Sequence, residues 1–191
     1  MTTFFIKSLI PGVKDCSWSS KNNRNQELVF LVDSSFVRNT LQFIKYNSFF
    51  QVKVLSDISG IDLLKTKNRS PIFSNVSNRF CVVYVLRSLL FNMNFRLIVP
   101  VDSDTIEVPS VVDIFSSAGW FECEVFEFFG IRFSGNANLH RLLTDYGFEG
   151  NPLCKDFPLS GYSEVSYSYS NKRVIHTPTV ELSQVKGFKD S

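Results

Sequence analysis

The stretch "RFCVVYVLRSLLFNMNFRLIVPVD", residues 79–102, joins two apolar runs through a short polar turn. Both runs are rich in residue types that favour strands, and Asn92 to Asn94 mark the place where the chain reverses. This pattern predicts a β-hairpin. Because the first run is short and is broken by Arg87, it cannot span a bilayer, and we expect no transmembrane segment.

This hairpin is one of several strand signals in the first half of the chain. Residues Val13–Ser19 and Glu27–Val32 flank a polar, Asn-rich turn and predict another hairpin. The second of these strands is apolar without alternation, which indicates burial on both faces. A further strand is expected to end at Gly60.

Helices are expected between these strands. Ser34 or Ser35 is a candidate cap for a helix with one apolar stripe at Val37, Leu41 and Ile44. The other expected helices are Thr3–Ile10 and a segment that begins at Ser110. Helices mixed with hairpin-connected strands predict an α+β fold, a two-layer sandwich with a mixed, mainly antiparallel sheet and helices on one face.

Regular periodicity largely disappears after Gly130. We therefore expect a compact α+β domain over residues 1–130 and an extended, irregular C-terminal segment over residues 131–191. Glycines in this segment permit sharp turns, and its aromatic side chains need burial. An irregular segment with aromatic anchors is typical of a stable interface with a partner, and the alternative is that it folds back on its own domain.

The stretch "GWFECEVFEFFG", residues 119–130, predicts a helix capped by Gly130. On a helical wheel Glu122 falls inside an aromatic arc, whereas Glu124 and Glu127 flank Trp120 on the opposite, solvated side. A buried carboxylate is costly unless it is paired, so Glu122 needs a cationic or amide partner. The nearby cations in the sequence are Arg132, Arg141 and Lys155.

Composition and motifs argue against several classes of protein. The net charge of +2 gives no basic stripe for nucleic acid, although an RNA-binding α+β module with stacking aromatics is an alternative. The four cysteines lack C-x-x-C spacing, which argues against a metal site. No catalytic or phosphate-binding motif is present. A small thiol or serine enzyme stays as a further alternative, with Cys154 and His140 as its candidate pair.

The stretch "FECEVFEFFGIRFSGNANLHRLLTDYGFEGNPLCKDFPLSGYSEV", residues 121–165, resembles the signature of a known family. It is similar to the 30-kDa-type subunit of respiratory complex I, which is NADH dehydrogenase subunit 9 in mitochondrial genomes. The runs "LTDYGFEG" and "KDFPLSGY" match that family almost without change. The chain departs from the family pattern at Cys123, Asn136, Ala137, His140 and Cys154, which puts individual ionic contacts in doubt.

The resemblance implies a non-catalytic structural subunit in the peripheral arm of NADH:ubiquinone oxidoreductase. Such a subunit binds no cofactor of its own, while the whole complex uses FMN, iron–sulfur clusters and ubiquinone. Its C-terminal segment clamps the 49-kDa-type subunit, and it contacts no nucleic acid. The residues expected at the partner interface or in its structural support are Glu122, Glu124, Glu127, Gly130, Arg141, Asp145, Tyr146, Gly147, Lys155, Asp156, Phe157, Pro158 and Tyr162.

The N-terminus "MTTFFIKSLIPGVKD" shows neither a signal-peptide nor a transit-peptide pattern. The chain contains 20 Phe residues, a bias that an A/T-rich organellar genome would produce. Together with the resemblance, these features predict a subunit on the matrix side of the mitochondrial inner membrane that is encoded in the organelle.

Overall fold

The computed structural model describes residues 9–20, 26–64, 73 and 76–179. The chain divides into two compact units, Met1–Cys154 and Lys155–Ser191, and each is described by itself. The predicted partner-binding segment, residues 131–191, therefore begins inside the first unit, and its boundary stays a prediction. Among the described residues, no helix combines the length and apolar character needed to cross a membrane.

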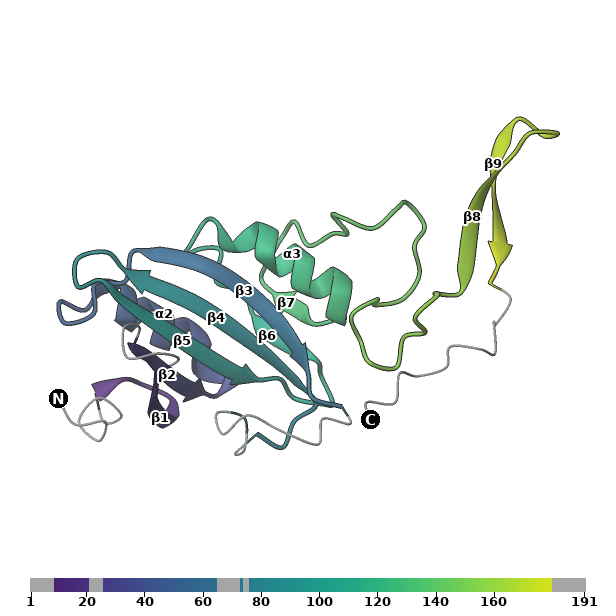
Figure 1. Ribbon diagram of the computed structural model, residues 1–191. Helices are drawn as coiled ribbons and strands as arrows, with labels where there is room; N and C mark the ends of the chain where they lie inside the picture. Colours follow the sequence, from purple (N-terminus) through teal and green to yellow (C-terminus); the bar gives the residue numbers. More distant parts are fainter. Residues whose placement is uncertain (1–8, 21–25, 65–72, 74–75, 180–191) are drawn as a thin grey trace. The chain divides into compact units, whose positions relative to one another are not determined.

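The first unit is built on a five-stranded sheet (Figure 1). In spatial order its strands are β1 (Val13–Ser20), β2 (Gln26–Val32), β5 (Met93–Pro100), β4 (Phe80–Ser88) and β3 (Val54–Asp62). The β2–β5 pair is parallel and the other pairs are antiparallel, so the sheet is mixed, as predicted. Both predicted hairpins, β1–β2 and β4–β5, are confirmed.

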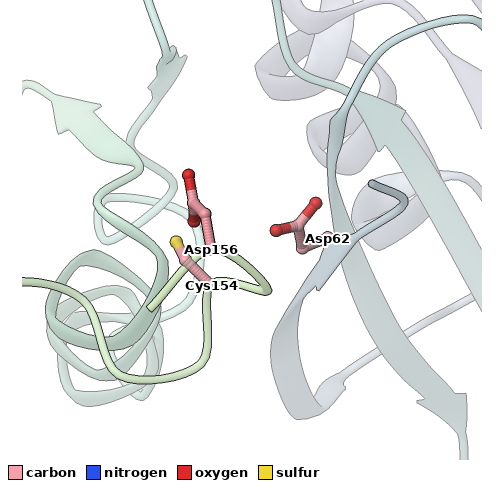
Figure 2. A group of neighbouring side chains, drawn as sticks. All are labelled: Asp62, Cys154 and Asp156. Atoms are coloured by element: carbon pink, nitrogen blue, oxygen red, sulfur yellow. The ribbon is translucent and has the colours of Figure 1, made fainter. Parts of the chain in front are cut away.

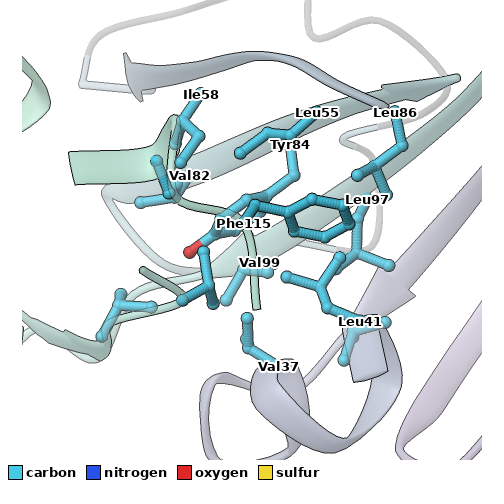
Figure 3. Packing of buried hydrophobic residues seen from close by; sticks show 14 of the residues in the cluster. Val37, Leu41, Leu55, Ile58, Val82, Tyr84, Leu86, Leu97, Val99 and Phe115 are labelled. Carbon is cyan, nitrogen blue, oxygen red and sulfur yellow. The ribbon is translucent and has the colours of Figure 1, made fainter. Parts of the chain in front are cut away.

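Alternation along the strands produces two apolar clusters. In β4, Val82, Tyr84 and Leu86 join the larger cluster, which also contains the helix residues, while Cys81 and Val83 join the smaller one. Successive side chains of a strand point to opposite faces, so the sheet separates the two clusters. Figure 3 shows the larger cluster, with Tyr84 inside it.

Helices α2 (Val37–Tyr46) and α3 (Ala118–Phe129) both contribute to the larger cluster, which confirms helices on one face of the sheet. The predicted stripe of α2 is confirmed, since its three apolar residues are fully buried. A short 3-10 helix, η1 (Ser34–Phe36), precedes α2, and Asp33 caps η1 by accepting a hydrogen bond from the Ser34 N–H. The predicted serine cap is therefore wrong by one or two positions.

The helix predicted from Ser110 is wrong, because α3 begins only at Ala118. The Ser110 hydroxyl and the Val111 N–H both donate to the Glu122 carboxylate, and residues 111–115 form a turn instead. The helix expected at Thr3–Ile10 lies outside the described residues except for its last two positions.

Two small sheets complete the described structure. In the first unit, β6 (Glu107–Pro109) and β7 (Arg132–Ser134) pair in parallel on either side of α3 in the sequence. In the second unit, β8 (Ser163–Ser168) and β9 (Arg173–Pro178) form an antiparallel hairpin. The sequence predicted an irregular segment there, so this hairpin is a correction to the predicted C-terminal segment.

Candidate functional site

Helix α3 is fixed on the sheet through a glycine in β3. A Cβ atom on Gly60 would lie 2.4 Å from a ring carbon of Phe129, so the absence of a side chain lets the helix approach the strand closely. The predicted C-terminal cap is confirmed, because Gly130 has φ 75° and donates its N–H to the Phe126 carbonyl. These contacts place the carboxylates of α3 in defined surroundings.

Glu122 is fully buried and accepts three hydrogen bonds. The donors are the Ser110 hydroxyl at 2.8 Å, the Val111 N–H at 2.8 Å and the Asn136 amide at 2.9 Å. The predicted amide partner is therefore Asn136 rather than a cation of the nearby sequence. Burial raises the pKa of Glu122, and the three donors together with the Arg38 charge oppose this shift.

Glu127 is also fully buried, which corrects its predicted place on a solvated face. Its carboxylate accepts hydrogen bonds from the backbone N–H groups of Leu142, at 2.7 Å, Leu143, at 2.9 Å, and Thr144. Burial alone would raise its pKa, but the Thr144 hydroxyl beside it and these N–H groups outweigh burial and lower the pKa to about 2. Residues 142–144 therefore form an anion-binding turn that covers Glu127.

A buried tyrosine of β4 lies close enough to Glu122 to feel its charge. Tyr84 is fully buried, and its hydroxyl has no hydrogen-bond partner among the described residues. Burial raises the pKa of Tyr84 strongly, and the nearby charge of Glu122 raises it further. A phenol that stays neutral at every physiological pH cannot serve as a base here.

The other α3 positions are divided between solvent and core. Glu124 and Trp120 are exposed, as predicted. Cys123 is buried, and its thiol lies 3.4 Å from the Asn138 carbonyl oxygen. Sequence reasoning missed Asn151, whose amide donates to the Glu127 carbonyl at 2.9 Å and so satisfies an unpaired group at the helix end.

We call residues 135–154 the strap. Within the strap, Arg141 donates to the Gly150 carbonyl at 2.8 Å, and its guanidinium carbon lies 5.9 Å from the centroid of the Phe148 ring. Asp145 starts a tight turn. Its carboxylate accepts a hydrogen bond from the Tyr146 N–H at 2.8 Å, and its backbone carbonyl accepts one from the Phe148 N–H at 3.1 Å. The helical turn that the run "NLHRLL" allowed does not form, because Glu127 takes the N–H groups that such a turn would use.

The strap presents apolar side chains to solvent. Tyr146 is 100% exposed, and Leu143 and Leu153 expose more than half of their surface. Gly147 follows Tyr146 with φ 76°, a conformation that L residues rarely adopt. The strap therefore combines a hydrogen-bonded backbone with large exposed apolar side chains. This combination is typical of a protein-interaction surface.

The remaining predicted residues belong to the second unit. The rings of Phe157 and Tyr162 meet edge to face at 5.2 Å between centroids, and the Gly161 N–H donates to the Pro158 carbonyl at 3.0 Å. Lys155 and Asp156 are exposed at the start of this unit. The structure thus groups the predicted residues into Glu127 with the strap and a Phe157–Tyr162 turn, and their contact with another chain stays a prediction.

Two further polar groups of the first unit are drawn in Figure 2. Asp62 ends β3 and forms a two-point ion pair with Arg79, whose Nε and Nη2 atoms lie 3.2 and 3.0 Å from its oxygens. Cys154 ends the strap, and its thiol lies 3.5 Å from the Phe129 carbonyl oxygen. Asp156, also drawn there, belongs to the second unit.

Comparison with protein families gives one match over most of the chain. A family model described as "Respiratory-chain NADH dehydrogenase, 30 Kd subunit" matches residues 30–163. This range contains the sheet of the first unit from Phe30 onward, helix α3, the strap and the Phe157–Tyr162 turn.

Curated relatives carry matching names. "NADH dehydrogenase (ubiquinone) iron-sulfur protein 3, mitochondrial" of Candida albicans is 41% identical over 83% of this chain and 52% of its own length. The chain thus spans about half the length of that relative. The C-type NADH-quinone oxidoreductase subunit of Paramagnetospirillum magneticum is 42% identical over 85% of this chain and 75% of its own length. The rice protein "NADH dehydrogenase (ubiquinone) iron-sulfur protein 3" is 41% identical over 87% of this chain and 82% of its own length.

Two solved structures share the fold. A trypsin-resistant fragment (1–134) of Nqo5 is 26% identical with a TM-score of 0.53, covering 65% of this chain and 89% of the fragment. A chain from the membrane-bound sulfane sulfur reductase, an archaeal respiratory membrane complex, has a TM-score of 0.61 and covers 82% of this chain and 85% of its own length. At 22% identity this match shows a shared fold and nothing more. None of these matches supports an RNA-binding module or a stand-alone thiol or serine enzyme.

Proposed function

The chain belongs to the family of the 30-kDa subunit of respiratory-chain NADH dehydrogenase, and from this premise we propose a specific role for it. It serves as a non-catalytic structural subunit in the peripheral arm of NADH:ubiquinone oxidoreductase, complex I. Its C-terminal segment clamps the 49-kDa-type subunit. The observation that carries this proposal is the ordered strap, which displays fully exposed Tyr146 beside Leu143 and Leu153.

The clamp acts through geometry. Electron transfer and quinone reduction require redox centres at fixed separations, and a subunit that binds across a neighbour restricts its motion. Glu127 supports this role because its buried charge holds the backbone of residues 142–144 in one conformation before a partner arrives. A preordered binding segment loses less conformational entropy on association, which strengthens binding.

A role without an active site of its own fits the polar groups of the first unit. The two buried carboxylates of α3 are saturated by donors from the chain itself, Glu122 by three donors and Glu127 by three backbone N–H groups. A carboxylate occupied in this way is a poor general base. The relatives are subunits of an oxidoreductase by name, and we assign the chemistry to other subunits of the assembly.

The cysteines do not fit an iron–sulfur cluster, although two relatives carry that term in their names. Most such clusters are held by four thiolates that lie within reach of one another. Cys16 packs against the larger apolar cluster, on the helix side of the sheet. Cys81 lies in the smaller apolar cluster, on the opposite face of the sheet. The sheet therefore separates two of the four thiols, and we propose that this chain binds neither an iron–sulfur cluster nor a flavin.

We place the protein on the matrix side of the mitochondrial inner membrane, encoded in the organelle. The mitochondrial name of the Candida relative and the Phe-rich composition support this placement. The relative from Paramagnetospirillum magneticum shows that related chains also occur in bacteria.

The clamp is tested by changing its most exposed aromatic residue. We expect Tyr146→Ser to weaken incorporation of the chain into the assembly about thirtyfold, since truncation of an aromatic anchor costs about 2 kcal/mol. Because Tyr146 is entirely exposed in the free chain, folding should be unchanged. The measurement is the fraction of chain that co-migrates with NADH–quinone reductase activity on native gels, together with identification of the neighbours by cross-linking.

Trp18→Ser is the matched control, since Trp18 is a partly exposed aromatic residue on β1, outside the C-terminal segment. It should leave incorporation unchanged. Equal incorporation of Tyr146→Ser and the unaltered chain would contradict the clamp, and cross-links from the strap to subunits other than the 49-kDa type would contradict its partner.

A further inference from the structure

A group of large apolar side chains lies exposed at one end of the five-stranded sheet, far from the strap in the sequence. We call this group the turn patch, and its members are Tyr46, Phe49, Leu89, Leu90 and Phe91, which expose between 45 and 68% of their surface. Isolated exposed apolar residues are common, but a contiguous group of five on a free surface indicates an interaction site.

Two segments of the chain meet to form the turn patch. One is the end of helix α2 with the residues that follow it, and the other is the β4–β5 turn. The register Val54↔Arg87 places both at the same end of the sheet, and Figure 1 shows the turn there, where β3 begins. The Ser88 hydroxyl donates to the Gln51 carbonyl at 3.3 Å and joins the two segments. The patch is therefore part of the fold of the first unit.

The charges of the two segments that form the turn patch have one sign. Residues 42–54 and 86–94 contain the cations Lys45, Lys53 and Arg87 and no Asp or Glu. The two lysine Nζ atoms lie 5.6 and 6.0 Å from the centroid of the Tyr46 ring, so positive charge borders the apolar surface directly.

Two hollows flank Tyr46 and its neighbours. One has a volume of about 410 Å³ and is lined by Pro11, Asn39, Gln42, Phe43, Tyr46 and Asn47. The other, of about 510 Å³, lies between Lys45, Lys53, Val54, Leu55 and residues 112–117. Its carboxylate, Asp113, is paired with Arg38 at 2.8 Å. Lys45 Nζ donates to the Ile114 carbonyl in the wall of the hollow, and Lys53 is the second lysine that lines it.

We propose that the turn patch is a second protein-docking surface, which receives an acidic, apolar segment of another polypeptide. Apolar side chains of that segment cover Leu89, Leu90 and Phe91, and a carboxylate enters the hollow beside Lys45 and Lys53. Charge complementarity selects the acidic partner, and hollows of about 410 and 510 Å³ select a protein chain with protruding side chains, because a flat lipid surface cannot fill them. The proposal rests on the proposed function only in that the partner is another chain of the same assembly.

A photo-crosslinking experiment on the whole assembly tests this surface. A benzophenone amino acid at Leu90 should form an adduct with one other subunit, at a peptide that contains Asp or Glu. The same probe at Asp104, an exposed turn residue outside the patch, should not form that adduct. Lys53→Glu should lower the adduct yield about tenfold, because it places like charges opposite each other, whereas Lys53→Arg should retain it.

Sedimentation of the full chain with phosphatidylglycerol–phosphatidylcholine vesicles distinguishes a lipid surface as the occupant. We expect no vesicle binding that depends on Leu90. Binding that Leu90→Ser abolishes would overturn the proposal, as would a Leu90 probe that labels only lipid, only its own chain or nothing while the chain sits in an intact assembly. In those cases the proposed function survives, whereas a chain that never joins an assembly refutes the proposed function itself.

Discussion

The two buried carboxylates of α3 differ in what surrounds them. Glu122 is enclosed by side chains and backbone of the folded core, and burial raises its pKa. Glu127 lies five residues later and is equally buried, yet backbone N–H groups of the strap lower its pKa to about 2. Two identical side chains on one helix therefore carry opposite shifts, because one faces the core and the other faces an irregular segment that needs hydrogen-bond acceptors.

This difference indicates different roles. Glu122 connects the segment before α3 to the segment after β7, through Ser110 and Asn136. Glu127 supplies the charge that organises the strap, whose backbone has no sheet or helix to satisfy it. We infer that Glu122 completes the fold, whereas Glu127 prepares the surface that binds a partner.

The largest expected effect is that of Glu127→Gln. Its pKa falls from 4.5 to about 2 on folding, so the ionised form stabilises the protein by about 3 kcal/mol at neutral pH. This contribution is complete above the unfolded value of 4.5 and is lost as the pH falls towards 2. We therefore expect the variant to lose about 3 kcal/mol at pH 7 in urea unfolding, and the loss to shrink below pH 4.5.

The matched control is Glu124→Gln, an exposed carboxylate on the same helix, which should change the free energy of unfolding by less than about 0.5 kcal/mol. Limited trypsin digestion adds a local readout, since Glu127→Gln should accelerate cleavage after Arg141 in the strap. Equal unfolding free energies for Glu127→Gln and Glu124→Gln would contradict the role of Glu127.

An intermediate effect is expected where α3 meets the sheet. A methyl group at Gly60 would lie 2.4 Å from the Phe129 ring, so Gly60→Ala must displace the end of the helix that carries Glu127. We expect a loss of about 2 kcal/mol, in the range for overpacking. Gly119→Ala is the control, because its methyl group would have ordinary contacts and should raise helix stability by up to about 1 kcal/mol. A Gly60→Ala protein as stable as the unaltered chain would mean that α3 is less tightly seated than the structure shows.

The sheet and α2 could be predicted from the sequence because their signals are local. Residues 79–102 carry two apolar runs of strand length, and Val37, Leu41 and Ile44 repeat at helical spacing. In each case the residues that define the pattern also form the core, so period and burial agree. The family resemblance was equally local, since it depended on the contiguous run from Phe121 to Val165.

Elements that depend on distant contacts could not be predicted in the same way. A helical wheel places Glu127 on the solvent side, and only the folded strap covers it with the N–H groups of residues 142–144. The segment that was expected to be a helix from Ser110 is likewise fixed by a distant residue, since Glu122 accepts the Ser110 hydroxyl and the Val111 N–H. The β8–β9 hairpin had a usable signal, the period-two spacing of Val165 and Tyr167, but both of these side chains stay exposed in the chain.

The smallest expected effect, and the one that tests the contrast by its sign, is that of Glu122→Gln. The amide can keep some of the three hydrogen bonds, so we expect a loss of about 1 kcal/mol at pH 7. Because burial raises the folded pKa of Glu122 above 4.5, the unaltered protein loses stability as the pH rises through that range. The cost of Glu122→Gln should therefore be larger at pH 4 than at pH 7, opposite to Glu127→Gln. Urea unfolding of both variants at the two pH values measures this, and pH trends of the same sign would show that the two sites are not electrostatically distinct.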